Sequence, residues 1–510
     1  MTRYLLGIDS GTSMVKSVVF DVQGREIAIA RREMPLLHPH PDAVEVEMER
    51  VWIAAASTIQ EVVAAVGAEQ IAAVGISGTA CGFWGIDESG APVRSAILWN
   101  DGRAAPVIAR WQADGTYRRV FALSGNAPFP GYPLSLLAWL DAHEAQTLAR
   151  TRWLLFHKDW LRYRLTNTIA TDASDISYFP GAIEQGGDVE PLLSLAGLTA
   201  YRDCIPPLAP SGSVGGAVTA AAAAQTGLRQ GTPVAVGAVD VVSSALGGGV
   251  HAVGQACAIL GTSFLNSLVV AQPAFVPVES GVQAAMPGGG WLRSVVNTSG
   301  TINIDWLVEE LAGEERAAAQ DGGSVYAHIE ARLREVAPGA GGLVYLPFLN
   351  SAGIVSPFAE PNARGMFFGL SQETTRVHLM RAVYEGTALA MRDCFDAIGQ
   401  PVEEVVLVGG GARSGFWAQM FADATGRRIV VAEGSEFGAR GAALLAGIAV
   451  GVYASHSAAA ATLSIAQRYT PEASAARAYD LLYPLYRHLV QSSREAWRLR
   501  QQIAQQLQEL

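Results

Sequence analysis

The residues most suited to chemistry in this chain lie in short turns between apolar runs. Residues 5–21 read LLGIDSGTSMVKSVVFD, with a turn of small polar residues between two apolar segments. In that turn Ser10, Gly11, Thr12 and Ser13 supply hydroxyls and backbone N–H groups, and small side chains let an anion approach such donors. The turn therefore fits phosphate oxygens. It also fits an ordinary β-hairpin, where Gly, Ser and Asp are common.

Two charged residues flank this turn, and a second turn repeats its pattern. Asp9 ends the first apolar run, and its hard carboxylate oxygens suit Mg²⁺, while Lys16 either adds positive charge to the turn or points to solvent. Residues 255–270 read QACAILGTSFLNSLVV, a fainter copy of the unit, whose turn is Gly261, Thr262 and Ser263. One such turn in each half would hold both ends of a triphosphate. Neither has the GxxxxGK[ST] spacing of a P-loop.

A carboxylate follows the buried strand predicted at residues 232–240, TPVAVGAVD. Open α/β sheets bind ligands at the carboxyl ends of their strands, so Asp240 could accept a hydroxyl proton and orient that oxygen for attack on phosphorus. Asp is also a favoured N-cap for a following helix. Position alone leaves both interpretations open.

The segment ILWNDGRA at residues 97–104 gathers an aromatic face and planar hydrogen-bonding groups, which together recognise a neutral polyol well. The alternative is a surface loop with a local salt bridge. Its candidate residues are Trp99, Asn100, Asp101 and Arg103.

A third glycine turn, LVGGGARSGFW at residues 407–417, follows a predicted strand and opens a predicted helix. Its glycines let a flat or anionic ligand lie against the backbone near a helix N-terminus. A dinucleotide fold would place GxGxxG early in a βαβ unit, whereas this GGGxxxG comes late in the chain, so the pattern argues against a dinucleotide fold.

Short apolar runs alternate with helical patterns, which predicts an α/β protein. Strands are expected at 3–9, 15–21, 25–31 and 71–77, and helices at 47–66 and 376–398. The glycine run at 247–249 is the best candidate for a domain boundary, because the alternation of apolar runs and helical patterns restarts beyond it. We therefore expect domains at 1–249 and 250–510.

Composition narrows the function class. A chain of 510 residues with 50% hydrophobic and 16% charged residues predicts two ordered domains, and a net charge of −11 argues against nucleic-acid binding. Four dispersed cysteines without a CxxC pair fit a reducing cytosol with neither a disulfide framework nor a zinc site. No signal peptide is visible, and the apolar stretch after Arg440 is too short to span a bilayer. We expect a soluble cytoplasmic protein with no membrane contact.

The order of these motifs resembles the FGGY carbohydrate kinases, within the wider group that includes actin and the heat-shock chaperones. The most specific segment is GMFFGLSQETTRVHLMRAVYE at 365–385, which fits the family's C-terminal signature at Gly365, Phe367, Gly369, Leu370, His378, Leu379, Ala382 and Glu385. The resemblance implies two RNase H-like (actin-like ATPase) domains with a nucleotide and sugar cleft between them. The N-terminal domain would bind sugar and phosphate, and the C-terminal domain the adenosine of ATP.

The resemblance also implies residue roles. Asp240 would be the catalytic base, and Asp9 would lie near Mg²⁺. Phosphate would be bound by Asp9, Ser10, Gly11, Thr12, Ser13, Lys16, Gly261, Thr262 and Ser263, the nucleotide by Gly300, Asp305, Gly410, Gly411 and Ser414, and the sugar by Asp240, Thr79, Ala80, Cys81, Trp99, Asn100, Asp101 and Arg103.

The implied substrate is a ketopentose such as xylulose, ahead of a polyol such as erythritol, another ketose or a sugar acid. D-xylulose kinases carry Gln-Met-His-Gly, and glycerol kinases an Arg-Glu pair, where this chain has Thr79-Ala80-Cys81-Gly82, so glycerol is disfavoured. The segments YPLSLLAWLDAHE and VDVVSSALGGGV are similar to the L-xylulose kinase branch. A homodimer is expected by resemblance. The alternatives are an actin- or chaperone-like ATPase that binds a protein partner, and a sugar sensor without catalysis.

Overall fold

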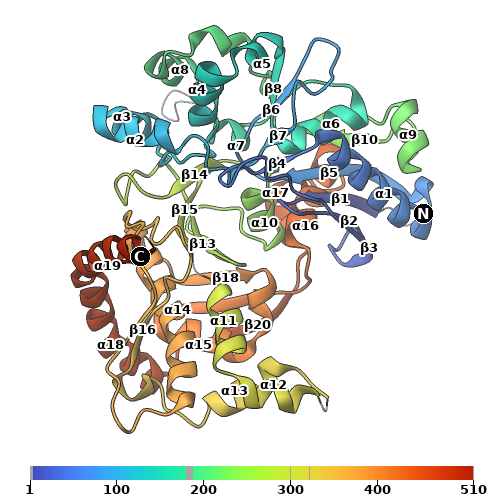
Figure 1. Cartoon of the computed structure of the whole chain (residues 1–510). Helices are drawn as coiled ribbons and strands as arrows, with labels where there is room; N and C mark the ends of the chain where they lie inside the picture. Colours follow the sequence, from blue (N-terminus) through green and yellow to red (C-terminus); the bar gives the residue numbers. More distant parts are fainter. Residues whose placement is uncertain (1–3, 180–187, 299, 321, 509–510) are drawn as a thin grey trace.

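The structure is a computed structural model that describes residues 4–179, 188–298, 300–320 and 322–508. Two seven-stranded sheets organise the chain, one in each half (Figure 1). The first has the order β3-β2-β1-β5-β10-β9, with β11 joined to β5, and the second has the order β14-β15-β13-β12-β18-β19-β20. Each half therefore has its own sheet, as the repeated turn predicted.

The two sheets share a common arrangement. In the first, β1 (Tyr4–Ser10) pairs antiparallel with β2 (Met14–Phe20), which pairs with β3 (Glu26–Glu33), while β5 (Ile71–Gly78) runs parallel to β1. In the second, the corresponding strands are β12 (Ala256–Leu260), β13 (Phe264–Val270), β15 (Trp291–Asn297) and the parallel strand β18 (Glu404–Val408). The duplicated motif is therefore a duplicated supersecondary unit, and each Gly-Thr-Ser turn closes its hairpin.

The other strands and the helices complete the layers. The remaining strands are β4 (Glu45–Val46), β6 (Trp84–Ile86), β7 (Ala96–Ile97), β8 (Trp153–Leu155), β9 (Val214–Ala217), β10 (Pro233–Ala235), β11 (Ala238–Val239), β14 (Val282–Ala285), β16 (Val344–Leu346), β17 (Met366–Phe368), β19 (Arg428–Ala432) and β20 (Ile465–Tyr469). The helices of the first half are α1 (Met48–Val66), α2 (Ala105–Asp114), α3 (Thr116–Ser124), α4 (Pro133–His143), α5 (Ala145–Arg150), α6 (His157–Thr166), α7 (Ala173–Ile176), α8 (Glu190–Ala196), α9 (Ala220–Thr226) and α10 (Asp240–Gly247).

The second half contains α11 (Ile302–Glu310), α12 (Gly313–Gln320), α13 (Val325–Leu333), α14 (Arg376–Ile398), α15 (Gly415–Thr425), α16 (Phe437–Ala449), α17 (His456–Ala460), α18 (Ala473–Ser492) and α19 (Arg494–Gln508). The predicted helix at 376–398 coincides with α14, which begins in a capping box formed by Thr375 and His378. Within the described residues, no helix is both long and apolar enough to cross a membrane.

Helix α16 lies against the first sheet although it comes from the second half of the chain (Figure 1). A methyl group on Gly7 would lie 1.8 Å from the Ala439 carbonyl oxygen, and one on Gly75 would lie 1.8 Å from the Ala442 carbonyl oxygen. The same distance separates a methyl group on Gly441 from the Ser243 carbonyl oxygen of α10. Only glycine at these positions lets helix and strand backbones approach so closely. The apolar stretch after Arg440 is this buried helix, so the halves are joined at their centre.

A second contact joins the halves at the end of the second sheet. Strand β14 meets the segment around α7, where the Gln283 N–H donates to the Asn126 side-chain oxygen at 2.5 Å. The Ala285 N–H donates to the Ser177 hydroxyl at 3.0 Å, and the Asn126 amide donates to the Ser177 carbonyl at 2.5 Å. These buried bonds fix the position of β14 relative to the first half.

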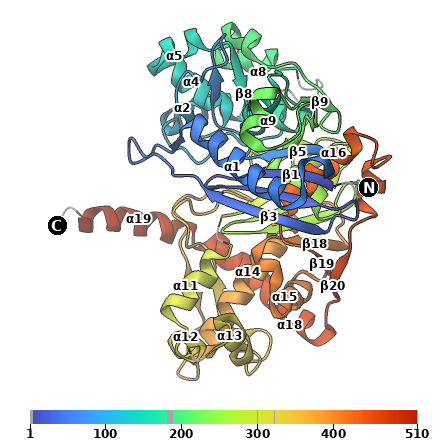
Figure 2. The same ribbon diagram turned by 90° about the vertical axis from the view of Figure 1, so that its right-hand side faces the viewer.

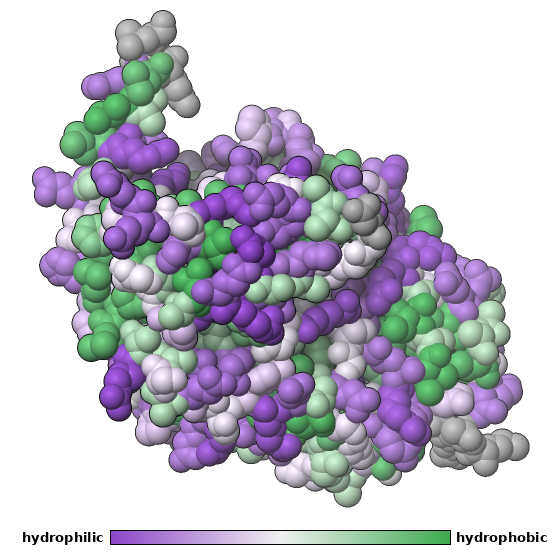
Figure 3. All heavy atoms as spheres, turned by 90° about the horizontal axis from the view of Figure 1, so that it is seen from below, coloured by the Kyte–Doolittle hydropathy of each residue, from purple (hydrophilic) through white to green (hydrophobic). Residues whose placement is uncertain are grey.

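The last helix, α19, extends away from the body of the molecule (Figure 2). Its first turn is anchored, because Trp497 packs edge-on against Phe348 with ring centroids 5.8 Å apart and Arg498 pairs with Glu360 at 3.0 Å. Beyond this anchor the helix carries exposed apolar side chains, visible as green spheres on the projection in Figure 3. They are Leu499, Ile503 and Leu507.

Candidate active site

The first hairpin turn is closed by its own backbone and linked to the predicted sugar loop. The Gly11 N–H donates to the Met14 carbonyl at 2.9 Å, and the Trp99 indole N–H donates to the Thr12 hydroxyl at 2.9 Å. Ser13 is exposed, while the Ser10 hydroxyl is buried and turned into the protein. The structure therefore brings Trp99 of the 97–104 segment to the predicted phosphate turn.

The second turn is closed by a backbone bond between residues closer in sequence, and it contacts a predicted nucleotide residue. The Gly261 N–H donates to the Ser263 carbonyl at 3.1 Å, and the Gly300 N–H donates to the Thr262 carbonyl at 2.8 Å. A methyl group on Gly300 would lie 2.5 Å from the Phe264 ring, so only glycine fits. Asp305 is exposed in the first turn of α11, four residues after Thr301. Gly300 thus belongs to the second turn.

Asp240 follows β11, which pairs in parallel with β5, and it is the first residue of α10. The predicted strand 232–240 is divided, because Gly237 has a left-handed φ of 84° and separates β10 from β11. The Val241 N–H donates to Asp240 Oδ1 at 2.7 Å, which leaves Oδ2 for another partner. The N-cap interpretation is wrong, because the N-cap of α10 is Val239 and Asp240 is the first helical residue, while the role of Asp240 as the base stays a prediction.

The carboxyl of Asp240 is poised to exchange a proton near neutral pH. Burial raises its pKa to about 7, and the negative charge of Asp9 adds to the rise, against the backbone N–H groups of Val241 and Ala80. Burial also raises the pKa of Asp9, which Lys16 lowers and Glu436 raises further. Two carboxylates thus act on each other at the ends of β1 and β11.

The arrangement of Asp9 fits Mg²⁺ held through one or two carboxylates together with substrate phosphates. A methyl group on Gly438 would lie 2.7 Å from Asp9 Oδ2, so the glycine at the start of α16 leaves room for this carboxylate. Among the residues that the structure describes, no cluster of three or more His, Cys, Asp or Glu could form a cage of protein ligands. Asp9 is therefore the residue that would hold such an ion together with substrate phosphates.

Lys16 is engaged by a residue from the other half of the chain. Its Nζ lies 2.9 Å from Glu436 Oε2, and Arg31 reaches Glu436 Oε1 at 2.6 Å. These two cations bond to the Glu436 carboxyl and hold its pKa below the usual range, although its burial acts in the opposite direction. Lys16 therefore lies beside the first turn, and its charge is shared between Asp9 and Glu436.

The predicted sugar loop begins at the end of β5. Cys81 is buried and has a left-handed φ of 66°, which is uncommon for a residue other than glycine. Burial raises the pKa of its thiol well above the usual range, and the charges of Asp175 and Asp240 contribute. Ala80 and Cys81 therefore lie close to the candidate base.

The second part of the predicted sugar site divides into exposed and buried residues. Trp99 and Asn100 are exposed, whereas Asp101 is buried and accepts hydrogen bonds from the Val44 N–H at 2.7 Å and from Arg103 Nε at 2.8 Å. Arg103 also reaches Glu45 at 2.5 Å. The structure thus gives Asp101 and Arg103 the salt-bridge role that the sequence left as the alternative, within a buried network that supports the loop.

The third glycine turn forms a 3₁₀ turn at Gly410–Arg413 between β18 and α15. A methyl group on Gly410 would meet nothing within 4 Å, whereas one on Gly411 would lie 3.0 Å from Leu260 Cβ. The open side of the turn is therefore at Gly410. Ser414 is the N-cap of α15, accepting from the Trp417 N–H at 3.0 Å and donating to Glu330 at 2.6 Å.

Several polar residues near the base were not predicted. Tyr132 is fully buried, its hydroxyl has no hydrogen-bond partner within the described part of the chain, and burial raises its pKa, to which the charge of Cys81 adds. Lys158 is also fully buried and pairs with Asp159, Asp172 and Asp175 at 2.7, 3.1 and 3.0 Å. These residues are far from Cys81 and Asp240 in the sequence, so spacing carried no signal for them.

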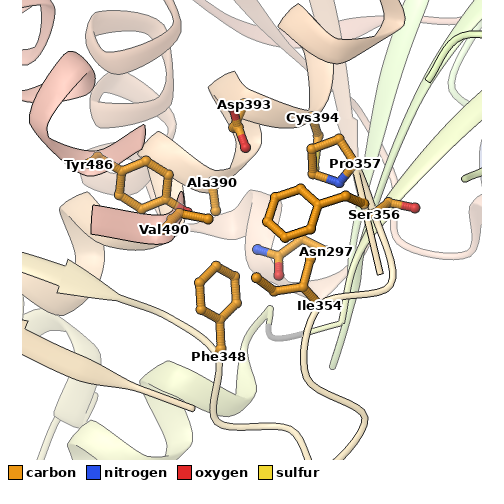
Figure 4. Close-up of a pocket in the computed structure, with 11 residues that line it drawn as sticks. Asn297, Phe348, Ile354, Ser356, Pro357, Ala390, Asp393, Cys394, Tyr486 and Val490 are labelled. Carbon is orange, nitrogen blue, oxygen red and sulfur yellow. The ribbon is translucent and has the colours of Figure 1, made fainter. Parts of the chain in front are cut away.

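A small cavity lies elsewhere, in the second half, between α14, α18 and the loop after β16 (Figure 4). Phe348, Ile354 and Tyr486 line it, and the Asp393 carboxyl points toward it. Its volume of about 10 Å³ has room for about one water molecule. A sugar or nucleotide would not fit in this cavity, so it is separate from the candidate active site at the turns and Asp240.

Comparison with known proteins identifies the family. The N-terminal domain of the FGGY family of carbohydrate kinases matches residues 4–247, and the C-terminal domain matches residues 256–450. The chain belongs to the FGGY family of carbohydrate kinases. It is a two-domain sugar kinase of the actin-like ATPase fold, which settles the choice against an ATPase that binds a protein partner.

Relatives of this FGGY kinase match it over nearly the whole length. The L-xylulose/3-keto-L-gulonate kinase of Escherichia coli (strain K12) is 31% identical over 504 residues, covering 96% of this chain and 97% of that protein. The erythritol kinase of Brucella abortus (strain 2308) is 30% identical over 497 residues, covering 95% of each.

Solved structures agree on the fold of this FGGY kinase. The xylulose kinase from Rhodospirillum rubrum has a TM-score of 0.87 at 28% identity, covering 97% of this chain and all of that one. The gluconate kinase from Lactobacillus acidophilus has a TM-score of 0.90 at 21% identity, covering 98% and 99%, and shows the fold alone.

Proposed function

We propose that this FGGY kinase transfers the γ-phosphoryl group of ATP to a hydroxyl of a ketopentose of the xylulose type. The observation that carries the mechanism is Asp240, whose carboxyl has a pKa of about 7 and one oxygen held by the Val241 N–H. A general base works best when its pKa lies near the working pH. Similarity to kinases named for L-xylulose and xylulose supports the substrate class.

In the proposed reaction, Asp240 Oδ2 accepts the proton of the attacking sugar hydroxyl. The sugar oxygen forms a bond to the γ-phosphorus as the bond to the β-phosphate oxygen breaks, and ADP leaves. The turns at Gly11–Ser13 and Gly261–Ser263 offer backbone N–H groups and hydroxyls to the phosphates, and Lys16 adds charge. The two domains would close around both substrates and exclude water.

The proposal extends to the phosphoryl donor and to the metal ion. The family implies ATP as the phosphoryl donor, and we propose that its adenosine lies against Gly410 and near Gly300. We propose that Asp9 holds Mg²⁺. When bound, this ion would neutralise charge on the phosphates. Asp9 itself lies partly buried between Lys16 and Gly438, which keeps the carboxylate in one position.

The substrate is tested by an ATP-consumption screen. We expect sugar-dependent ADP release with L- or D-xylulose to exceed that with tetritols, ketohexoses and sugar acids at equal concentration. Erythritol is the second candidate, because a relative of similar identity is an erythritol kinase. Faster turnover with erythritol or a sugar acid would replace the ketopentose assignment, and ADP release independent of any sugar would contradict it.

We further propose a domain boundary at residues 249 and 250 and a cytoplasmic location. The family domains end at 247 and begin at 256, which supports the boundary. The free cysteines, three of them buried, and the absence of any CxxC pair suit a reducing compartment. The net charge of −11 disfavours a nucleic-acid partner.

We propose that a second copy of this chain is the partner, paired through α19. Leu499, Ile503 and Leu507 are spaced four residues apart, so they form one ridge, and they are 55%, 45% and 64% exposed. An isolated helix of this length is marginal in water, so its outer turns need a partner. Such ridges interlock in the commonest class of helix packing.

Charge favours an antiparallel pair of these helices. Centred on Ile503, the pair places Leu499 opposite Leu507 of the second copy and Arg500 opposite Gln506. A parallel pair would instead place the two Arg500 side chains together. Stable interfaces bury about 1,200–2,000 Å². Other exposed apolar side chains, such as Val276, Val278 and Val355, are available to add to that area.

A further inference from the structure

His157 is a buried histidine that bridges two predicted binding segments. It is the first residue of α6 and is only 1% exposed. Its Nε2 lies 2.7 Å from the Ser10 hydroxyl, and its Nδ1 lies 2.9 Å from the Thr79 hydroxyl. The ring is stacked on Trp84, with centroids 4.2 Å apart and planes 16° apart. Both ring nitrogens are therefore used, and the ring has one fixed orientation.

The chemistry of the ring suits this bridge. Burial lowers the pKa of His157 to about 3, so the imidazole is neutral at any working pH. A neutral imidazole has one N–H donor and one nitrogen acceptor, and each hydroxyl can take either role. One histidine thus satisfies both partners, and it adds no charge next to Lys158.

The two partners of His157 lie in segments assigned to different substrates. Ser10 is the residue before Gly11, so it fixes the start of the phosphate turn, and the Thr79 N–H also donates to the Ser10 carbonyl at 3.2 Å. Thr79 begins the sugar loop, and the backbone N–H of the next residue, Ala80, faces the Asp240 carboxylate. The bridge therefore connects the phosphate turn to the loop that supports the base.

We propose that His157 is a positioning residue, which holds the phosphate turn through Nε2 and the sugar loop through Nδ1 in a single register. The proposal rests on the proposed function, since it assigns the first turn to ATP and the Thr79–Cys81 loop to the sugar. His157 touches neither substrate. It acts by limiting the movement of Ser10 and Thr79 relative to each other.

The two nitrogens are separated by two substitutions. Asparagine places its amide where Nδ1 lies, so His157→Asn keeps the Thr79 bond and loses the Ser10 bond. Glutamine reaches the position of Nε2, so His157→Gln keeps the Ser10 bond and loses the Thr79 bond. We expect KM for ATP to rise about tenfold in His157→Asn, with KM for the sugar within about twofold, and the reverse in His157→Gln. His157→Phe should raise both KM values and lower kcat.

Matched variants keep the proposal testable if the His157 variants fold poorly. Thr79→Val removes one hydroxyl at equal volume, so it should reproduce the KM pattern of His157→Gln. The double variant of Thr79→Val and His157→Gln should have a KM for the sugar no higher than that of either single variant. His143→Asn is the control, because that exposed histidine bonds only the Trp139 carbonyl of its own helix among the described contacts. It should leave both KM values unchanged.

The outcomes are distinct. A wild-type enzyme without sugar-dependent turnover would remove the proposed function itself. Activity in the wild type, together with equal effects of His157→Asn and His157→Gln on both KM values, would overturn the positioning role. The positioning role would also be overturned if His157→Asn, His157→Gln and Thr79→Val all stayed within twofold of the wild type in every kinetic constant.

Discussion

At the residue scale, the site depends on how neighbours tune a few ordinary side chains. Burial raises the pKa of Asp240, the charge of Asp9 adds to the rise, and the Val241 N–H holds its Oδ1. The position of Asp240 after an apolar run predicted this residue. The network of Asp101 and Arg103 with Glu45 could not be predicted, because Val44 and Glu45 come from a distant segment. His157 was missed for the same reason.

The raised pKa of Asp240 predicts the pH dependence of the reaction. The base must be ionised to accept a proton, so activity is retained above its pKa and lost as pH falls through it. We expect kcat/KM for the sugar to be level above about pH 7.5 and to fall about tenfold per unit below pH 6.5, around the pKa of about 7. Initial rates from pH 5.5 to 8.5 measure this. A flat profile across that range would contradict the assignment.

At the element scale, hydrophobic periodicity predicted most of the fold. The strands of the first hairpin, the helix at 376–398 and the segment from strand to glycine turn to helix at 404–425 lie where the pattern placed them. The return of α16 to the first sheet was not predicted, because helical periodicity shows that a helix is buried without showing which sheet buries it. The feature of the sequence that marks this contact is the set of strand glycines that face α16, such as Gly7 and Gly75.

The close packing of α16 predicts a large effect from a small substitution. In Gly75→Ala the new methyl group would lie 1.8 Å from the Ala442 carbonyl oxygen, so strand and helix must separate. We expect the free energy of unfolding to fall by about 3 kcal/mol, measured by denaturant titration. Gly313→Ala is the control, because a methyl group there meets nothing within 4 Å, and it should change stability little. Equal stability of the two variants would mean that α16 does not pack as described.

At the scale of the whole molecule, two similar units are joined by α16 and by β14, while α19 extends away from both (Figure 2). Helix α18 packs into the core, where Tyr479 and Tyr486 are buried, whereas the apolar ridge of α19 is exposed. Periodicity identifies an apolar face but does not distinguish the chain's own core from the surface of a second copy.

The ridge on α19 predicts how the proposed dimer can be broken. Ile503→Arg places two like charges at the centre of the antiparallel pair, so we expect a monomer at concentrations where the wild type sediments as a dimer. Gln505→Arg adds the same charge on the opposite side of the helix and should leave the dimer intact. Sedimentation velocity distinguishes these states. A wild-type monomer, or a dimer that survives Ile503→Arg, would contradict the pairing.

The most direct test of the account is sugar-dependent ADP release by Asp240→Asn, compared with the wild type and paired with a nucleotide-affinity measurement by calorimetry. Asparagine keeps the size and the polar contacts of Asp240 but cannot take the hydroxyl proton. We expect kcat to fall by about two decades or more while the Kd for ATP stays within about twofold. Turnover close to that of the wild type would show that Asp240 is not the base.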